Sequence, residues 1–297
     1  MARIPFLLGL LFGAILLFVY VTSRPDGKLH LVFCDVGQGD AIFIKTPDNL
    51  DLLVDGGPDE SVLHCLGENM PFYDRTIDIV VLTHPENDHL KGLLSVIDRY
   101  NVKYFVSVPA GSNYEDFRQL QKKIEIKGIQ VKNLYLGDYF MLGQVRFNVL
   151  WPERKWLAEQ LGKSLPPTGS SNILGISAEG ENLNDFSVVL HLSYGGFDTL
   201  LTGDGDSRIQ SDIARTVQLP DIEILKFPHH GSKTGVTREF LDRLKPELTV
   251  ISVGKNPWGH PTREALDMLE SVKSRVARTD RDGEIEIVTD GTSWSLH

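Results

Sequence analysis

One short stretch constrains this chain more than any other, the apolar run that ends in VVLTHPENDHLKG at residues 80–92. Within six residues it carries two histidines and two acids, which are His84, Glu86, Asp88 and His89. Polar groups at the end of a buried strand are costly to desolvate unless a partner compensates them. The stretch therefore predicts a strand buried on both faces that delivers four polar side chains to a common partner.

The same arrangement recurs along the chain. Asp55 ends the run LLVD, Asp204 ends TLLTGD, His229 and His230 follow ILKFP, and His260 comes shortly after TVISVG. The carboxyl ends of strands are where α/β sheets place their sites, so we expect these side chains to lie together. Imidazole and carboxylate groups together suit Zn²⁺, Mn²⁺ or Fe, whereas Ca²⁺ prefers oxygen ligands alone.

The spacing in H-x-E-x-D-H favours one or two metal ions. Its first two side chains alternate along an extended loop and can face one ion, while Asp88 and His89 can turn toward a second at the helix start. Asp204 can bridge the two, and a two-metal site lowers the pKa of a bridging water. Taken singly, Asp88 is typical of a helix N-cap, and Asp55 and Asp204 are typical of turns. Their shared position at strand ends favours the metal site.

The amino terminus differs from the rest of the chain. Residues 4–21 are an uncharged apolar run that would form a helix about 27 Å long, close to the thickness of a bilayer's hydrocarbon core. We expect residues 1–23 to be a single-pass membrane anchor rather than a cleaved signal peptide, and residues 24–28 to be a linker. Residues 29–297 would form one domain, placed outside the cytoplasm, although basic residues on both sides of the run encode the orientation only weakly.

Strands and helices alternate through this domain. Apolar runs predict strands at 29–36, 41–47, 52–57, 77–84, 102–108, 131–136, 144–152, 185–194, 197–204, 222–227, 247–254, 284–290 and 293–297. Helical spacing predicts helices at 61–70, 89–100, 113–128, 207–218, 237–246 and 261–272. The Pro-, Gly-, Ser- and Asn-rich residues 163–184 predict a long, flexible surface loop. This order predicts an α/β (α+β) sandwich of two facing sheets with helices outside.

The net charge and the cysteine content exclude few classes of function. The net charge of −10 excludes a generally basic, nucleic-acid-binding surface but not a local basic or metal-lined cleft. Cys34 lies in an apolar run and is expected to be a small core residue. A disulfide between Cys34 and Cys65 would suit an exported domain and is the less favoured alternative.

These motifs resemble those of known hydrolases. THPENDH resembles the HxHxDH motif of metallo-β-lactamase-fold hydrolases, with Glu86 where the second histidine usually stands. FCDVGQGDAIFI, LLVDGG, LTGDGD, FPHHGS, NPWGHP and RTDRDGEIEIVTDG are similar, in the same order, to the extracellular hydrolase domain of ComEC-type DNA-uptake proteins. The resemblance spans residues 29–291 and implies a four-layer αββα sandwich with metals at one edge.

The resemblance implies one or two divalent ions, Zn or Mn. The implied ligands are His84, Glu86, Asp88, His89, Asp204 and His260. The first two would hold one ion and the next two the other, with the aspartate of LTGD as the bridge and the histidine of NPWGHP as the last ligand. Glu86 and Asn184 stand where many relatives have histidines, so the first site is poorer in nitrogen, which favours Mn²⁺ or weak occupancy.

The resemblance also implies supporting residues. The candidate catalytic residues are His229, His230 and Asp88. One of the two histidines would protonate the leaving oxygen or bind the phosphate, and one could instead be a ligand. Asp55 would hold a ligand histidine in the correct orientation, and Asn184 would be a second residue that supports the ligands. Lys233 and Lys255 would contact the phosphate.

We therefore predict a membrane-anchored, metal-dependent hydrolase, with a phosphodiester such as DNA as the favoured substrate. ComEC-type proteins carry a multi-helix channel, so this chain, with its single apolar run, would work beside a separate DNA-uptake channel or alone. A small-ester hydrolase is the first alternative, either a lactonase or a phosphorylcholine esterase with Trp151, Trp156 and Trp258 as an aromatic cage. The second alternative is a non-catalytic module that binds DNA or a channel partner.

Overall fold

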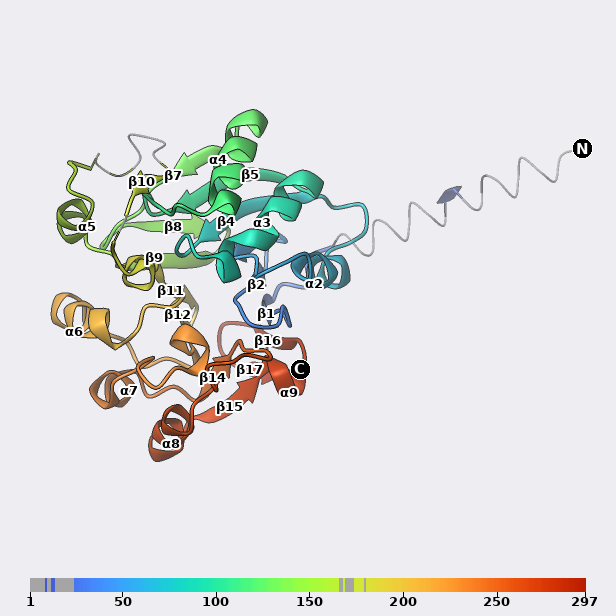
Figure 1. Cartoon of the computed structure of the whole chain (residues 1–297). Helices are drawn as coiled ribbons and strands as arrows, with labels where there is room; N and C mark the ends of the chain where they lie inside the picture. Colours follow the sequence, from blue (N-terminus) through green and yellow to red (C-terminus); the bar gives the residue numbers. More distant parts are fainter. Residues whose placement is uncertain (1–8, 10–11, 14–23, 166–167, 169–173, 179) are drawn as a thin grey trace, which may run out of the picture.

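Two β-sheets face each other across an apolar core, with helices on both outer faces (Figure 1). This computed structural model describes residues 9, 12–13, 24–165, 168, 174–178 and 180–297. The strand order of the first sheet is β17 (Trp294–Leu296), β16 (Ile285–Thr289), β1 (Leu29–Phe33), β2 (Ile42–Lys45), β3 (Asp51–Val54), β4 (Thr76–Leu82), β5 (Asn101–Ser107) and β7 (Gln130–Lys132). The order of the second is β15 (Arg275–Arg278), β14 (Leu248–Ile251), β13 (Ile224–Lys226), β12 (Phe197–Leu201), β11 (Val189–Tyr194), β9 (Val145–Trp151) and β8 (Tyr139–Leu142).

Three apolar clusters define the layers. The central cluster joins inward-facing side chains of both sheets, such as Phe33 and Ile44 with Phe147 and Leu190. A second cluster packs the outer face of the first sheet against α2 (Val62–Asn69), α3 (Asn87–Arg99) and α4 (Glu115–Lys127). A third packs the second sheet against α6 (Ser207–Thr216), α7 (Arg238–Leu244) and α8 (Arg263–Ser271). The predicted mixed α/β sandwich of two sheets is confirmed.

Strand β4 is the best example of a sequence pattern that fixes a position in the fold. It pairs in parallel with β3 on one side and with β5 on the other. The residues at its carboxyl end are buried, as the unbroken apolar run predicts. Because β3, β4 and β5 run in the same direction, their carboxyl ends open on one edge of the sheet.

Several elements were not predicted from the sequence. They include β8, β15, α5 (Arg154–Gln160) and α9 (Thr279–Asp282). The RVAR strand β15 is an edge strand with exposed arginine and valine side chains, and charged edge strands carry little apolar periodicity. In α5 only Leu157 is fully buried, so its helical stripe is short.

Two predicted segments lie wholly or partly outside the described residues. Of the expected anchor at residues 4–21, the structure describes only Gly9, Phe12 and Gly13. Within the described part of the chain, no helix combines the length and the apolar character needed to cross a bilayer. Of the expected loop at 163–184, the described part includes β10 (Ile176–Ser177), paired with β6 (Ala110–Gly111), and η1 (Leu183–Phe186).

Cys34 and Cys65 form a disulfide bond. The less favoured of the two sequence interpretations is therefore the one that the structure shows. Cys34 directly follows β1 and Cys65 lies in α2, and their Cα atoms are 5.7 Å apart because α2 packs over the end of that strand. The bond ties α2 to the loop that leads from β1 to β2.

Helix α3 approaches the β3 turn so closely that only glycine fits at the contact. The Gly92 N–H donates to the Gly57 carbonyl oxygen at 3.0 Å, and the Gly56 N–H donates to the His89 carbonyl oxygen at 2.7 Å. A Cβ atom on Gly92 would collide with the carbonyl oxygen of Gly56. This contact fixes the first turn of α3, and therefore His89, relative to Asp55.

We expect Gly92→Ala to destabilise the protein by about 1–3 kcal/mol, because the methyl group forces α3 away from the turn. Alanine is otherwise the better helix former by about 1 kcal/mol. The matched control is Gly67→Ala in α2, where an added Cβ meets nothing within 4 Å, and this variant should be slightly stabilised. Urea unfolding of both variants measures the difference, and equal stabilities would contradict the close contact.

Reduction of the disulfide should lower the free energy of unfolding by about 3–4 kcal/mol, since the bond closes a loop between residues 31 positions apart. Urea unfolding with and without dithiothreitol measures this loss. A Cys34→Ala/Cys65→Ala double variant should unfold at the same urea concentration in both conditions. An unchanged midpoint for the natural chain would show that the bond adds nothing to stability.

Candidate metal centre

The side chains singled out from the sequence converge on one edge of the sandwich. Asp55 follows β3, His84 follows β4, and His89 lies in the first turn of α3. From the second sheet, Asp204 follows β12 and His230 follows β13, within the short helix η2 (Pro228–Gly231). In each case the polar side chain comes from the loop or helix that follows the strand.

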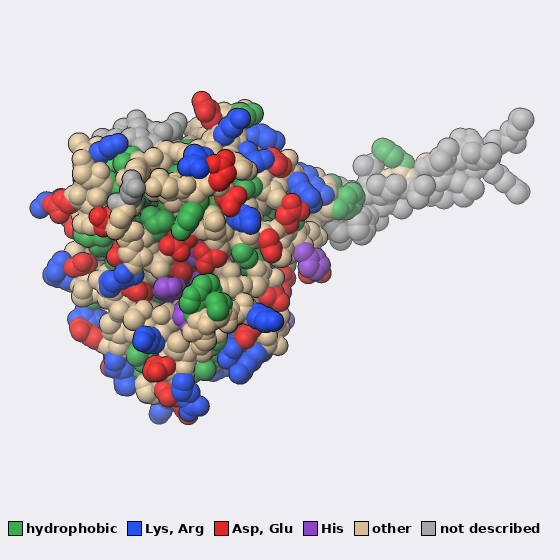
Figure 2. Space-filling model, viewed as in Figure 1, with side chains coloured by type: hydrophobic (Ala, Val, Ile, Leu, Met, Phe, Trp, Pro, Cys, Tyr) green, Lys and Arg blue, Asp and Glu red, His purple; other side chains and the backbone are tan. Residues whose placement is uncertain are grey.

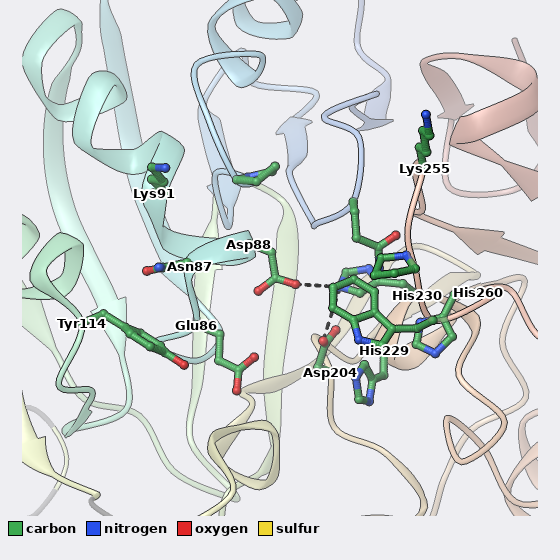
Figure 3. Close-up of a pocket in the computed structure, with 14 residues that line it drawn as sticks. Glu86, Asn87, Asp88, Lys91, Tyr114, Asp204, His229, His230, Lys255 and His260 are labelled. Carbon is green, nitrogen blue, oxygen red and sulfur yellow. Dashed lines mark ion pairs between the residues drawn. The ribbon is translucent and has the colours of Figure 1, made fainter.

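Asp88, His89, Asp204 and His230 form a compact set, with one possible ligand atom from each lying within 4.8 Å of the others. The Asp204 Oδ2 atom lies 3.4 Å from His89 Nε2 and 3.4 Å from His230 Nε2. His230 Nε2 is also 3.4 Å from Asp88 Oδ2, and Figure 3 shows these side chains directed at one another. Two carboxylates and two imidazoles in this arrangement are a suitable donor set for Zn²⁺ or Mn²⁺.

Hydrogen bonds fix which nitrogen of each imidazole faces this set. His89 Nδ1 bonds to Asp55 Oδ2 at 2.8 Å, and His230 Nδ1 bonds to the Ser252 carbonyl oxygen at 2.9 Å. A carboxylate and a carbonyl oxygen only accept, so both Nδ1 atoms carry the proton. The Nε2 atoms of His89 and His230 are buried and have no hydrogen-bond partner among the described residues.

His84 is oriented in the same way through a neighbour. The Thr83 hydroxyl donates to Asp55 Oδ2 at 2.7 Å, so its oxygen accepts from His84 Nδ1 at 3.0 Å. The Thr83 N–H donates to the other Asp55 oxygen at 2.8 Å. Because the proton of His84 is on Nδ1, its Nε2 atom carries none. This Nε2 atom is buried and has no hydrogen-bond partner among the described residues. Buried nitrogens with no hydrogen-bond partner fit the ligands of a metal ion, and Asp55 orients the rings of His84 and His89.

The charges of the set favour cation binding. Burial opposes a charge on His230, but Asp204 and Asp40 raise its pKa to about 10. Burial opposes a charge on His89 too, yet Asp204 and Asp55 raise its pKa well above the usual range. Burial alone would raise the pKa of Asp88 and Asp204, whereas the adjacent imidazoles lower both. The carboxylates are ionised and attract positive charge, which protons supply when no metal ion is bound.

Glu86 lies beside the compact set rather than within it. Its carboxyl group lines the same pocket, and burial, followed by the charges of Asp88 and Asp204, raises its pKa to about 7. Figure 3 shows Glu86 on the side of the pocket that Tyr114 occupies. Burial and the neighbouring His89 lower the pKa of His84, so this imidazole is neutral.

The structure gathers His230, rather than His260, with the other three residues of the set. His260 lies half-buried in the pocket wall, with its ring 5.7 Å from that of His229. Both His229 and His230 have positive φ angles, which turn their side chains in different directions. Of the three histidines, His230 is the one that the compact set includes.

The other predicted residues are placed as follows. Lys255 lines the pocket, whereas Lys233 is exposed and lies outside the pocket wall. Asn184 is 7% exposed, and its side-chain oxygen has no hydrogen-bond partner among the described residues. Trp151 and Trp156 pack against each other, and Trp258 alone of the three proposed tryptophans lines the pocket.

Asp40 and Lys226 also belong to the site, although the sequence motifs did not indicate either residue. Lys226 is fully buried in β13 and forms an ion pair with Asp40. Its ammonium group donates to the Gly203 carbonyl oxygen at 2.9 Å and lies 3.6 Å from Asp204 Oδ1. Burial favours neutral lysine, but Asp40 and Asp204 raise its pKa. A lysine inside the apolar run ILKF was the available signal, because a buried charge requires a partner.

The set opens into a cavity of about 600 Å³. Its lining residues include Gln38, Glu86, Asp88, Lys91, Tyr114, Asp204, His229, His230, Lys255, Trp258 and His260. Figure 2 shows histidine, acidic and apolar side chains meeting near the centre of the displayed face. A cavity of this size holds a small molecule or one unit of a polymer.

Comparison with known proteins agrees with this geometry. Residues 34–255 match the metallo-beta-lactamase superfamily. ComE operon protein 3 of Bacillus subtilis is 29% identical, covering 91% of this chain and 34% of its own length. Competence protein ComA of Neisseria gonorrhoeae is 25% identical, covering 94% of this chain and 36% of its own length. The chain thus spans about a third of the length of the curated relatives it matches.

Among solved structures, the metallo-beta-lactamase fold protein YhfI of Bacillus subtilis superposes with a TM-score of 0.52 and 13% identity, covering 87% of this chain and 99% of its own. At that identity the likeness concerns the fold alone. The family match and the competence-related relatives confirm the resemblance to ComEC-type hydrolase domains that the motifs indicated. The chain belongs to the metallo-beta-lactamase superfamily.

Proposed function

We propose that this chain is a metal-dependent phosphodiesterase that cleaves DNA outside the cytoplasm in connection with DNA uptake. The observation that carries the proposal is the compact set of Asp88, His89, Asp204 and His230, in which the buried Nε2 atoms of both imidazoles face the Asp204 carboxylate at 3.4 Å. Residues 4–21 would anchor the chain in the membrane as a single span. A separate DNA-uptake channel is the partner that we propose, and one relative of this chain is named a competence protein.

The donor set favours Zn²⁺ or Mn²⁺. The four residues of the compact set would hold one ion, and His84 with Glu86 would hold a second beside it. Such an ion stabilises charge on a phosphoryl oxygen and lowers the pKa of water. The remaining chemistry falls to the protein's own side chains.

We propose that His229 and His260 act on the leaving group. Both line the cavity next to His230, and the Nδ1 atom of each is buried without a hydrogen-bond partner among the described residues. Burial and the adjacent histidines lower the pKa of His260, so at neutral pH its ring is uncharged. In this proposal the His229 imidazole protonates the leaving oxygen, and the uncharged His260 ring donates a hydrogen bond to a phosphoryl oxygen. Lys255 adds a positive charge to the same wall.

The alternatives have less support. A choline-ester cage needs several aromatic rings around one cation. Trp151 is 1% exposed, and Trp156 packs between Trp151 and Phe186, so neither ring is free to form such a cage. A non-catalytic binding module would not require the orphaned imidazole nitrogens of the compact set.

The direct test is hydrolysis by the full chain with Mn²⁺, with Zn²⁺ or with chelator. We expect cleavage of single-stranded DNA and of bis-p-nitrophenyl phosphate, and Asp204→Ala should lower kcat/KM on both by at least about 100-fold because it removes a ligand. Asp221→Ala, an aspartate whose side chain is 74% exposed, is the matched control and should retain full activity. Cleavage of the small ester alone would favour an esterase, and no turnover with any metal would favour a binding module.

Metal binding should release protons and strengthen as the pH rises. His230, with a pKa of about 10, holds a proton at pH 7.5 and must lose it to act as a ligand. For each proton that metal binding releases, raising the pH by one unit should lower the apparent Kd about tenfold. Calorimetric titration with Zn²⁺ in phosphate and in Tris measures the number released, which His230→Ala should reduce by one. Identical heats in the two buffers would contradict the prediction.

A further inference from the structure

We propose that Trp258 is a stacking platform for a nucleobase, so that the substrate of this site is a single-stranded nucleic acid. This inference rests on the proposed function and specifies its substrate. Trp258 lines the cavity, yet its side chain is 64% exposed. Its ring centroid lies 6.2 Å from that of His260, at an interplanar angle of 31°. A large apolar ring left open beside a reactive centre is available for contact with a ligand.

The loop that carries Trp258 is held rigid by the side chain of Asn256. The Asn256 Oδ1 atom accepts from the N–H groups of Trp258 at 3.1 Å and of His260 at 3.0 Å. The Asn256 amide nitrogen donates to the carbonyl oxygens of Gly254 at 2.8 Å and of His260 at 2.9 Å. The backbone that carries the indole is therefore ordered before a ligand arrives, which lowers the entropy cost of stacking.

The cavity offers an aromatic ring and a lysine on each of two sides. Figure 3 shows Tyr114 and Lys91 on one side of Asp88, and Lys255 on the other side with His260. Tyr114 is 43% exposed, and Trp258 is only three positions from Lys255 along the loop. Proteins that bind single strands combine stacking rings with cations that follow the phosphates. The two walls thus suit an extended strand lying across the metal centre.

A single strand fits this arrangement better than a duplex. In a duplex each base is already stacked on its neighbours, so a ring at the cavity wall gains a contact only if the base is first unstacked. A free strand offers its base faces without that cost. The substrate class inferred is therefore a strand with unpaired bases, recognised without regard to sequence because every base has a π face.

The test compares two substrates that differ only in their bases. The full chain with Mn²⁺ is given an oligothymidylate and an abasic phosphodiester strand of the same length. We expect kcat/KM to be about tenfold higher for the oligothymidylate, since stacking contributes about 1–3 kcal/mol per base. Trp258→Ala should reduce this ratio to near unity, Trp258→Phe should retain part of it, and Phe72→Ala, with a ring 73% exposed outside the cavity wall, should retain all of it.

A binding measurement separates this inference from the proposed function. In the Asp204→Ala background, oligothymidylate should quench indole fluorescence, and the quenching should disappear with Trp258→Phe or with the abasic strand. Cleavage of both strands at equal rates, or an unchanged ratio in Trp258→Ala, would overturn the platform and leave the phosphodiesterase standing. If neither strand is cleaved, the phosphodiesterase fails, and the presence or absence of base-dependent quenching alone decides the platform.

Discussion

The ion pair between Lys226 and Asp40 is the interaction on which the rest of the site depends. Three buried aspartates, Asp40, Asp55 and Asp204, lie close together, and their negative charges repel one another unless a positive charge lies among them. Lys226 supplies that charge from inside β13. Its ammonium group touches Asp40, lies 3.6 Å from Asp204, and is itself held by the Gly203 carbonyl oxygen. The charge is therefore present before any cation arrives, and the carboxylates are held in place around it.

The fold brings the candidate ligands together by arranging strand ends, and close packing then sets their orientation. Asp55 has a positive φ angle at the end of β3, which turns its carboxylate toward Thr83 and His89. The contact between Gly92 and Gly56 brings the first turn of α3 against that strand end. Hydrogen bonds made by Asp55 and by the Ser252 carbonyl oxygen then select the imidazole nitrogens that face the metal site. Backbone geometry, packing and the choice of imidazole tautomer together determine which atoms face one another in the compact set.

The sequence predicted the parts of the site whose signal is local. His84 to His89 stand out because polar residues end a fully apolar strand, and the two-sheet sandwich follows from strand clusters at both ends of the chain. What it could not predict depends on contacts between distant segments. Choosing among His229, His230 and His260 requires the positive φ angles of η2 and the position of Ser252. Lys226 was hidden within an apolar run, and the Cys34–Cys65 bond depends on how α2 packs over β1.

The compact set takes its members from both halves of the sandwich. Asp88 and His89 come from the helix that follows β4 in the first sheet, while Asp204 and His230 follow β12 and β13 in the second. Any cation bound by all four residues would link the two sheets. Its binding free energy would therefore also stabilise the packing of one sheet against the other. The candidate site therefore lies where the two sheets meet, so a cation bound there would also stabilise the sandwich.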